Sequence, residues 1–532
     1  MTRDDIAAGE SLHSATEVGS PQVDPTAIDK LLEPFDRTNQ PGFAVGIALN
    51  GVPQYRRGVG VASVELPTPL SPHIRMRIGS TTKHFCALAI MLLAEAGRLN
   101  IEDNPRKYVP ELPEWADTFT IHQLMSHTSG MRDSFDLLFQ ACGPGIVTSP
   151  DIPLTLLKNV DGVNFAPGTS WRYNNSGYAL LSEIVERVSG QDFGLFLKKR
   201  IFEPVGMYES MLRRLDTDIV PNSASLHVPM PDGSWSRGVF GVPLSGEGGI
   251  VSTVDDMLRW LKHMADPVVG SRESWQLMQK SHTSHGYGLG LMMHKHRGLD
   301  TIHHAGAVAG GSSQMLKVLD HDLDIVVLNN NGLNVLAMYQ LVDAIIDACV
   351  PGLPPAPIDA GGTPIEGTFY SRETGRVISL IAHDGAQLLS LSGMMLPTIR
   401  DSDGGISVQI IPTDLLIRPE AEGTRLQVTE FGSVDTLERT EPPHGEGLDG
   451  QVGSYTSGSA DITAELSRSE EGYTLRLANS VGSLLYPLMP IGPRLWQMVS
   501  PVSMPLGGTL EFNDNEFLFS TGSTTRIRFT RL

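Results

Sequence analysis

The chain has 532 residues, of which 40% are hydrophobic and 19% charged, and a formal net charge of −20 at pH 7. It is too long for one ordinary domain, and its composition is that of globular proteins. The strong negative charge argues against nucleic acid and anionic membranes as partners, because phosphate groups would be repelled.

The first 25 residues are expected to form a flexible tail. They place two acidic residues directly after the first arginine and hold no apolar stretch of the kind that a secretory signal needs. The three cysteines, Cys86, Cys142 and Cys349, are widely spaced and form neither a disulfide framework nor a zinc-binding pattern. Together these features predict a cytoplasmic protein.

The first predicted elements are a hairpin and a buried helix. Two apolar strands, 43–49 and 52–60, flank Asn50-Gly51, which is the strongest short-range signal for a hairpin. The run 85–96 is almost free of polar residues and is followed by Gly97, as in a core helix that ends at a glycine. This run is too short to span a membrane.

Ser80 and Lys83 stand in front of this helix. A helix that begins near Thr81 would bring the two side chains together on one face. Burial and the positive end of the helix dipole favour a neutral lysine, which can take the proton of the serine hydroxyl. The same spacing is also explained if Ser80 only caps the helix and Lys83 is a solvated residue of its first turn. Other motifs must decide between this explanation and a catalytic pair.

The rest of the N-terminal half is mainly helical and closes with a second hairpin. The predicted helices cover 121–125, 178–188, 193–200 and 254–264. Strands at 314–319 and 323–328 and an amphipathic helix at 335–349 follow. Strands at both ends with helices between them predict one antiparallel sheet packed against a helical region, an α+β fold.

Helical periodicity ends at a proline-rich linker, 350–357. The remainder divides again near 441–447, and Gly367-Thr368-Phe369 in its first half matches Gly453-Ser454-Tyr455 in its second. Such weak self-similarity with many short strands predicts two small antiparallel β-barrels. The expected organisation is a tail (1–25), a catalytic domain (26–350) and two barrel domains (362–441 and 448–532).

Tyr173 and Asn175 lie in a polar segment between a turn and a helix. If this piece is extended, the two side chains point the same way. A phenol beside a lysine can pass a proton to a leaving amine, and an amide can hold a substrate carbonyl or orient the lysine. A loop tyrosine whose hydroxyl is merely hydrogen-bonded is the alternative.

His304 is followed by a small residue and by Gly306, just before the strand at 314–319. This pattern lets a substrate backbone lie along a sheet edge, with the histidine offering a hydrogen bond. A structural or metal-binding histidine is the alternative, because six histidines gather here: His282, His285, His294, His296, His303 and His304. No carboxylate or thiolate joins them at ligand spacing, so neither a metal nor a cofactor is predicted.

Two glycine-bearing corners, 124–131 and 246–257, lie between apolar pieces. By themselves they indicate little chemistry. In the second corner Ser252, Thr253 or Asp255 is expected to cap a helix.

Taken in order, these motifs resemble the serine β-lactamase and DD-peptidase superfamily, in its class C β-lactamase and D-aminopeptidase branch. The matching motifs are Ser80-x-x-Lys83, 124–130, Tyr173-x-Asn175, Gly248-Gly249-x-x-Ser252-Thr253 and His304-x-Gly306. The resemblance spans about residues 40–345 and implies a β-lactamase/transpeptidase-like catalytic domain. With two barrels after this domain, the whole chain resembles the three-domain D-aminopeptidases of bacteria.

The resemblance assigns roles to individual residues. For the reaction they are the nucleophile Ser80, the base Lys83 and the proton relay Tyr173. For substrate binding they are Asn175, His304 and Gly306. The implied oxyanion hole is the backbone N–H of Ser80 and one on the strand after Gly306, at a residue that the sequence does not identify.

In the D-aminopeptidases that this chain resembles, a loop of the last barrel reaches the cleft and helps to hold a free amine. The similar region here is 477–486, with Asn479, Ser480 and Val481 at its turn, and it has no carboxylate. Amine recognition by this loop is therefore not assured. The substrate can instead be an amide or ester without a free amine.

The resemblance implies a serine hydrolase that releases N-terminal D-residues from short peptides or amides through an acyl-enzyme. A carboxylesterase or β-lactamase-like hydrolase, and a catalytically vestigial peptide-binding protein, are the alternatives. The expected partner is a small molecule or short peptide, with a homodimer as the default for a soluble protein.

Overall fold

The computed structural model describes residues 19–144, 152–160, 162–283, 286–332, 335–391, 394–408, 414–430, 432–442, 447–458, 460–502 and 506–532. Most of the expected tail, His285 and part of the expected boundary at 441–447 lie outside these ranges. The backbone N–H groups of Gly19 and Gln22 donate to the carbonyl oxygens of Pro351 and Cys349, at 2.8 and 2.9 Å. Among the described helices, none has the length and apolar character needed to cross a membrane.

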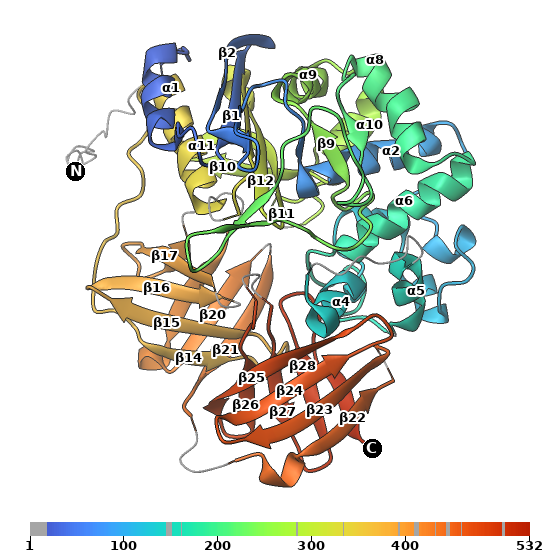
Figure 1. The fold of residues 1–532 in the computed structure, drawn as a ribbon, viewed down its shortest axis with the longest axis vertical. Coiled ribbons are helices and arrows are strands. Elements are labelled where there is room, and N and C mark those ends of the chain that lie inside the picture. The colour runs from blue at the N-terminus through green and yellow to red at the C-terminus, as the bar shows by residue number, and fades with distance from the viewer. Residues whose placement is uncertain are drawn as a thin grey trace, which may run out of the picture.

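A six-stranded antiparallel sheet forms the centre of the N-terminal domain (Figure 1). Its strand order is β10-β11-β12-β13-β1-β2. The strands are β1 (Phe43–Leu49), β2 (Val52–Val59), β10 (Met292–His296), β11 (Leu299–Val308), β12 (Gly311–Val318) and β13 (Leu323–Asn329). Asn50 and Gly51 both have positive φ, 53° and 67°, as the predicted two-residue hairpin requires.

Helices cover both faces of this sheet. On β1 the side chains of Phe43, Val45 and Ile47 pack with α1 and α11, whereas those of Ala44 and Ala48 join the core on the opposite face. This alternation follows from the two-residue period of a strand. The sheet is therefore the middle layer of three.

The remaining elements of this domain surround the sheet. The helices are α1 (Pro25–Leu32), α2 (Lys83–Glu95), α3 (Ile121–Met125), α4 (Ser134–Cys142), α5 (Ile152–Asn159), α6 (Asn175–Ser189), α7 (Phe193–Leu197), α8 (Glu203–Val205), α9 (Val254–Ala265), α10 (Arg272–Met278) and α11 (Val335–Cys349). The short strands are β3 (Val61–Ser63), β4 (Thr68–Pro69), β5 (Met76–Arg77), β6 (Met211–Leu212), β7 (His227–Pro229), β8 (Trp235–Arg237) and β9 (Ile250–Ser252).

Two predicted helices differ in detail. The helix expected to begin near Thr81 starts with a 3₁₀ turn, η2 (Gly79–Thr82), and α2 itself begins at Lys83. The helix expected over 193–200 changes after Leu197 into a π-helical turn, Lys198–Phe202. Thr253 is the residue that caps α9, with its side chain accepting from the N–H of Asp256.

Two closed eight-stranded antiparallel barrels follow, as predicted. The first holds β14 (Gly367–Tyr370), β15 (Val377–His383), β16 (Ala386–Leu391), β17 (Met394–Arg400), β18 (Ile406–Val408), β19 (Leu416–Glu420), β20 (Arg425–Glu430) and β21 (Ser433–Thr440). The second holds β22 (Gly453–Ser457), β23 (Ile462–Ser469), β24 (Gly472–Ala478), β25 (Ser483–Gly492), β26 (Leu495–Met498), β27 (Thr509–Phe512), β28 (Glu516–Ser520) and β29 (Ile527–Arg531).

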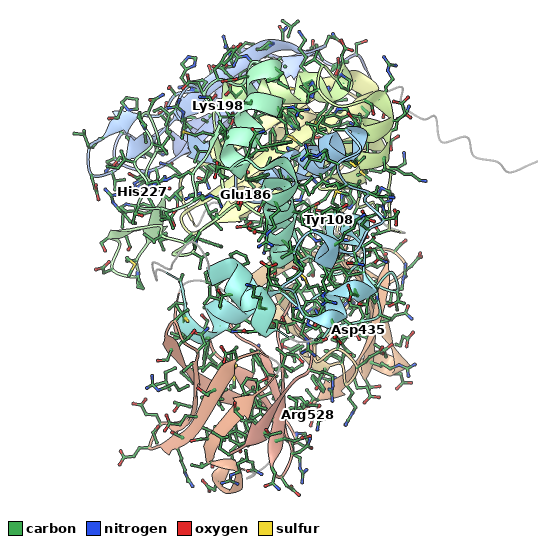
Figure 2. All side chains as sticks on the ribbon, turned by 90° about the vertical axis from the view of Figure 1, so that its right-hand side faces the viewer. Tyr108, Glu186, Lys198, His227, Asp435 and Arg528 are labelled. Atoms are coloured by element: carbon green, nitrogen blue, oxygen red, sulfur yellow. The ribbon has the colours of Figure 1, made fainter. Side chains whose placement is uncertain are left out.

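The second barrel packs directly against α4. Phe135 and Leu138 of α4 belong to the same buried cluster as Tyr455 and Leu475 of the barrel. Figure 1 shows both barrels on one side of the N-terminal domain, with α4 next to the second. Figure 2 shows Asp435 of the first barrel near the junction with the helices, and Arg528 on the second barrel. The N-terminal domain and the second barrel thus share one apolar cluster.

Candidate active site

Ser80 lies on η2, which packs against β11. This packing needs two glycines. An added Cβ on Gly306 would come within 1.9 Å of the Ile78 carbonyl oxygen, and Gly79 has a φ of +51° with its Cβ position 2.8 Å from the Ala307 nitrogen. Larger residues would push the serine away from the strand. Gly306 therefore brings the strand and the serine turn together.

The amine of Lys83 is fully buried and contacts three groups. Its Nζ lies 3.1 Å from Ser80 Oγ, 2.9 Å from Asn175 Oδ1 and 2.7 Å from the backbone carbonyl oxygen of Glu247. The side chain reaches these partners from the first residue of α2. The structure therefore brings together the serine and lysine that the sequence singled out.

Burial lowers the pKa of Lys83 from 10.5 to about 7, although the nearby carboxylates Glu247 and Asp133 act in the opposite direction. A large fraction of the amine is then uncharged near neutral pH. A neutral amine has a lone pair that can accept the serine proton. The site thus contains a base suited to neutral conditions.

The ring of Tyr173 packs over the Lys83 amine, with 4.7 Å between Nζ and the ring centroid. Its hydroxyl also interacts with the hydroxyl of Ser80. Burial raises the pKa of Tyr173 far above its ordinary range, so the phenol keeps its proton at physiological pH. The group next to the serine oxygen is therefore a proton donor.

Asn175 is the first residue of α6, which begins three residues before the predicted start at 178, so Tyr173 and Asn175 are not both in an extended segment. The reason is Asn174, whose side chain caps the helix by accepting from the N–H of Gly177 at 2.8 Å. Buried Asp133 supports the same turn, since its carboxylate accepts from the Asn175 N–H at 2.9 Å. Asn175 nevertheless reaches Lys83, now from a helix terminus.

His304 lies on β11 with its side chain buried. Its ring nitrogens face the Ala305 carbonyl oxygen at 2.7 Å and the Tyr287 hydroxyl at 3.4 Å. Burial lowers the pKa of His304 to about 3, so the ring is neutral. Its ring lies beside that of Tyr173, with 6.4 Å between the two ring centroids.

The turn of the last barrel that holds Asn479, Ser480 and Val481 lies at the end of α4. There the thiol of Cys142 donates to Asn479 Oδ1 at 3.1 Å. Asn479 Oδ1 also accepts from the backbone N–H of Val481 at 2.8 Å. All three cysteines of the chain, Cys142 among them, are unpaired and buried.

Other barrel turns contact the segment that leads to Tyr173. From the first barrel, Ser433 lies 2.7 Å from the hydroxyl of Ser170. From the second, the carbonyl oxygens of Gly522 and Ser523 accept from Arg172 at 3.2 Å and from Asn164 at 2.9 Å. The sequence did not point to these contacts, since they depend on how the barrels dock.

One backbone nitrogen after Gly306 lies close to the serine turn. Ala307 is the first residue after Gly306, is exposed, and has its nitrogen next to Gly79 in the serine turn. Its N–H and that of Ser80 therefore belong to backbone segments in contact with each other. No sequence motif marks Ala307, because this contact is made by its backbone alone.

Comparison with known proteins adds independent information. The family model described as Beta-lactamase matches residues 28–338. The D-aminopeptidase of Gluconobacter oxydans is 27% identical over 443 residues, which are 80% of this chain and 82% of that protein.

Among solved structures, the octameric penicillin-binding protein homologue from Pyrococcus abyssi matches with a TM-score of 0.55 and 21% identity. That match covers 86% of this chain and 99% of the other. The D-amino acid amidase of Ochrobactrum anthropi SV3 matches with a TM-score of 0.54 and 22% identity, over 61% of this chain and 97% of the other. Both matches concern the fold.

The sheet, the serine turn and helices α2 to α10 fall within the segment that the family model matches, while α1 and α11 extend beyond its two ends. The chain therefore belongs to the Beta-lactamase family, with two closed eight-stranded barrels after its β-lactamase-like domain.

Proposed function

We propose that this protein is a D-stereospecific aminopeptidase or amidase that acts through an acyl-enzyme at Ser80. The observation that carries the proposal is the buried Lys83 amine, 3.1 Å from Ser80 Oγ and with a pKa of about 7. Likeness to a D-aminopeptidase along 80% of the chain supports the substrate class, because this likeness extends beyond the serine hydrolase domain.

In the proposed acylation step, Ser80 Oγ attacks the substrate carbonyl carbon while its proton moves to neutral Lys83. The N–H groups of Ser80 and Ala307 are the proposed donors to the resulting oxyanion. The Tyr173 hydroxyl gives its proton to the leaving amine and is reprotonated from Lys83. A water molecule then repeats the sequence on the acyl-enzyme and regenerates Ser80.

In this scheme Asn175 keeps the Lys83 amine aimed at the serine and is the proposed ligand of the substrate carbonyl. Gly306 has an indirect role, since its lack of a side chain lets β11 approach the serine turn. His304 supports the site from within through its contact with Tyr287.

A carboxylesterase is the second candidate. The observation in its favour is the turn at Asn479, which has no carboxylate and contacts Cys142. An ester or an amide without a free amine would not need a carboxylate from this turn.

The test is hydrolysis of D-alanine p-nitroanilide and of its L enantiomer, with the native protein and Ser80→Ala side by side. Cleavage of the D form alone, lost in Ser80→Ala, is the expected result. Rapid turnover of p-nitrophenyl acetate with no cleavage of either anilide would favour the esterase. Undiminished cleavage by Ser80→Ala would refute the proposed nucleophile.

A further inference from the structure

Glu247 is a buried acid that none of the steps above uses. Only 3% of its surface is exposed. Its Oε1 accepts from the backbone N–H of Ser245 at 2.8 Å, and its Oε2 is buried without a hydrogen-bond partner among the described residues. An acid in such a place is costly to ionise, so its presence needs an explanation.

The main chain holds this residue against the catalytic lysine. The carbonyl oxygen of Glu247 is the one that accepts from Lys83 Nζ at 2.7 Å. The neighbouring Gly246 has no space for a side chain, because an added Cβ would lie 2.6 Å from both Cys86 Sγ and the Tyr178 carbonyl oxygen. The backbone directly before Glu247 is therefore packed closely between α2 and α6.

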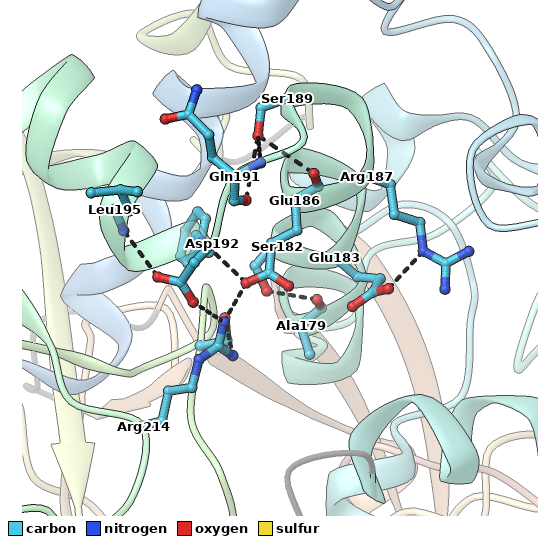
Figure 3. A network of polar contacts seen from close by, with 12 residues as sticks. Ala179, Ser182, Glu183, Glu186, Arg187, Ser189, Gln191, Asp192, Leu195 and Arg214 are labelled. Atoms are coloured by element: carbon cyan, nitrogen blue, oxygen red, sulfur yellow. Dashed lines mark hydrogen bonds and ion pairs between the residues drawn. The ribbon is translucent and has the colours of Figure 1, made fainter.

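Arg214, the other basic residue that acts on Glu247, is already paired. Figure 3 shows its guanidinium between the carboxylates of Glu186 and Asp192, and its nitrogen lies 3.2 Å from Asp192 Oδ2. The attraction of Arg214 for the Glu247 carboxylate is smaller than that of Lys83. The buried carboxyl therefore has the Lys83 amine as its main cationic neighbour.

The other titratable groups near Lys83 leave this pairing intact. Asp133 acts on the amine from α4's N-terminus but is held by the Asn175 N–H and the Ser176 hydroxyl. The remaining neighbours are neutral at physiological pH because burial favours their uncharged forms: Cys86, His127, Tyr173, Tyr178 and His304.

We propose that Glu247 is a positioning residue whose buried carboxylate stabilises the Lys83 ammonium and so sets the lowest pH at which Lys83 can activate Ser80. This inference rests on the proposed function. Burial raises the pKa of Glu247 to about 7, the same value to which burial lowers that of Lys83. The charge on Glu247 therefore changes in the pH range where the lysine becomes a base.

The sign of the effect follows from this pairing. Loss of the negative charge makes the ammonium less stable, so the pKa of Lys83 falls and neutral amine persists to lower pH. An opposite charge within about 4–6 Å shifts a pKa by about 1–3 units. The acid limb of the pH–rate profile is the range over which the reaction of Ser80 becomes faster as pH rises. Removal of the Glu247 charge should therefore shift this acid limb to lower pH by about one unit. The reaction near pH 6 should then be up to tenfold faster.

The test is the rate of Ser80 labelling by a fluorophosphonate probe between pH 4 and pH 9, for the native protein, Glu247→Gln and Glu247→Met. Gln keeps an acceptor for the Ser245 N–H but has no charge. Met fills similar space without placing an amide nitrogen in the buried position, so it serves if Glu247→Gln fails to fold. Circular dichroism identifies which variants are folded.

The expected result is a shift of the acid limb to lower pH in each folded variant. An unchanged limb would leave Glu247 with a structural role only and overturn the inference, while the proposed function would stand. If the native protein is not labelled at any pH, the proposed nucleophile fails and the inference falls with it. If neither variant folds, an acid limb in the native protein below pH 5 contradicts the pairing.

Discussion

The amide oxygen of Asn175 lies 2.9 Å from the amine of Lys83, although the two residues are 92 positions apart. The amide orients the amine without adding charge to it. We expect Asn175→Asp to place a negative charge at the same distance and to raise the pKa of Lys83. The acid limb of Ser80 labelling should then move about one unit to higher pH.

The position of the acid limb distinguishes an effect of charge on the pKa of Lys83 from an effect of lost packing. Asn175→Ala removes the contact without adding a charge, so it should reduce the labelling rate without moving the limb upward. A limb that stays in place in Asn175→Asp would contradict control of the lysine by its immediate neighbours.

Tyr173 is expected to matter most when the leaving group is basic. The raised pKa of its hydroxyl keeps the proton available for transfer. Tyr173→Phe should lower kcat by about 10²–10⁴-fold on D-alaninamide, whose leaving group needs a proton. A p-nitrophenyl ester, whose leaving group departs as an anion, should lose much less. Equal losses on both substrates would contradict the relay.

The contact between Asn164 and the last barrel should support the active-site segment. Its side chain donates to the Ser523 carbonyl oxygen at 2.9 Å and accepts from the Thr525 N–H at 3.0 Å. Asn164→Ala leaves these partners unpaired, so we expect the free energy of unfolding to fall by about 1–3 kcal/mol and the apparent melting temperature to decrease. Activity should fall as well, since this segment leads to Tyr173.

Asn159→Ala is the matched control for this variant. Asn159 also joins the last barrel, through a 3.1 Å hydrogen bond to Asp461, but it is exposed. Substitution of an exposed residue usually changes the free energy of unfolding by about 0.5 kcal/mol or less. Equal effects of the two substitutions in differential scanning fluorimetry would argue against a special role for the Asn164 contact.

Asp136 should make stability depend on pH. It lies on α4, where it accepts from the hydroxyl of Thr521 in the last barrel, and burial raises its pKa from 3.8 to about 6. Stability from this group is complete below pH 3.8 and is lost as pH rises through about 6, because the unfolded chain then releases its proton first. At about 1.4 kcal/mol for each pKa unit, the loss amounts to about 3 kcal/mol.

Asp136→Asn keeps an acceptor for Thr521 and cannot ionise. Between pH 4 and pH 7 its melting temperature should fall less than that of the native protein. Differential scanning calorimetry at both pH values measures the difference, and parallel decreases in the two proteins would contradict the assignment.

Local patterns predicted much of the fold. Asn50-Gly51 identified the first hairpin, because few other dipeptides accept positive φ at both positions. The helix over 335–349 matches α11, because its apolar spacing has no strand equivalent. Two barrels followed from the repeated strand pattern of the C-terminal part.

What the sequence could not provide depends on long-range packing. The helix start at Asn175 was missed because Asn174 fits a loop as well as a cap. The contact of the turn at Asn479 with Cys142 could not be predicted either, because it depends on how the last barrel docks against α4. Glu247 left only a weak signal, a single acidic residue among glycines before an apolar strand.

The most direct test of the account is intact-protein mass spectrometry after brief incubation with a D-alanyl p-nitrophenyl ester, followed by peptide mapping. The account predicts a D-alanyl adduct on the peptide that contains Ser80, with no adduct in Ser80→Ala. Turnover of the ester without an adduct in the native protein, and at the same rate in Ser80→Ala, would contradict an acyl-enzyme at this serine.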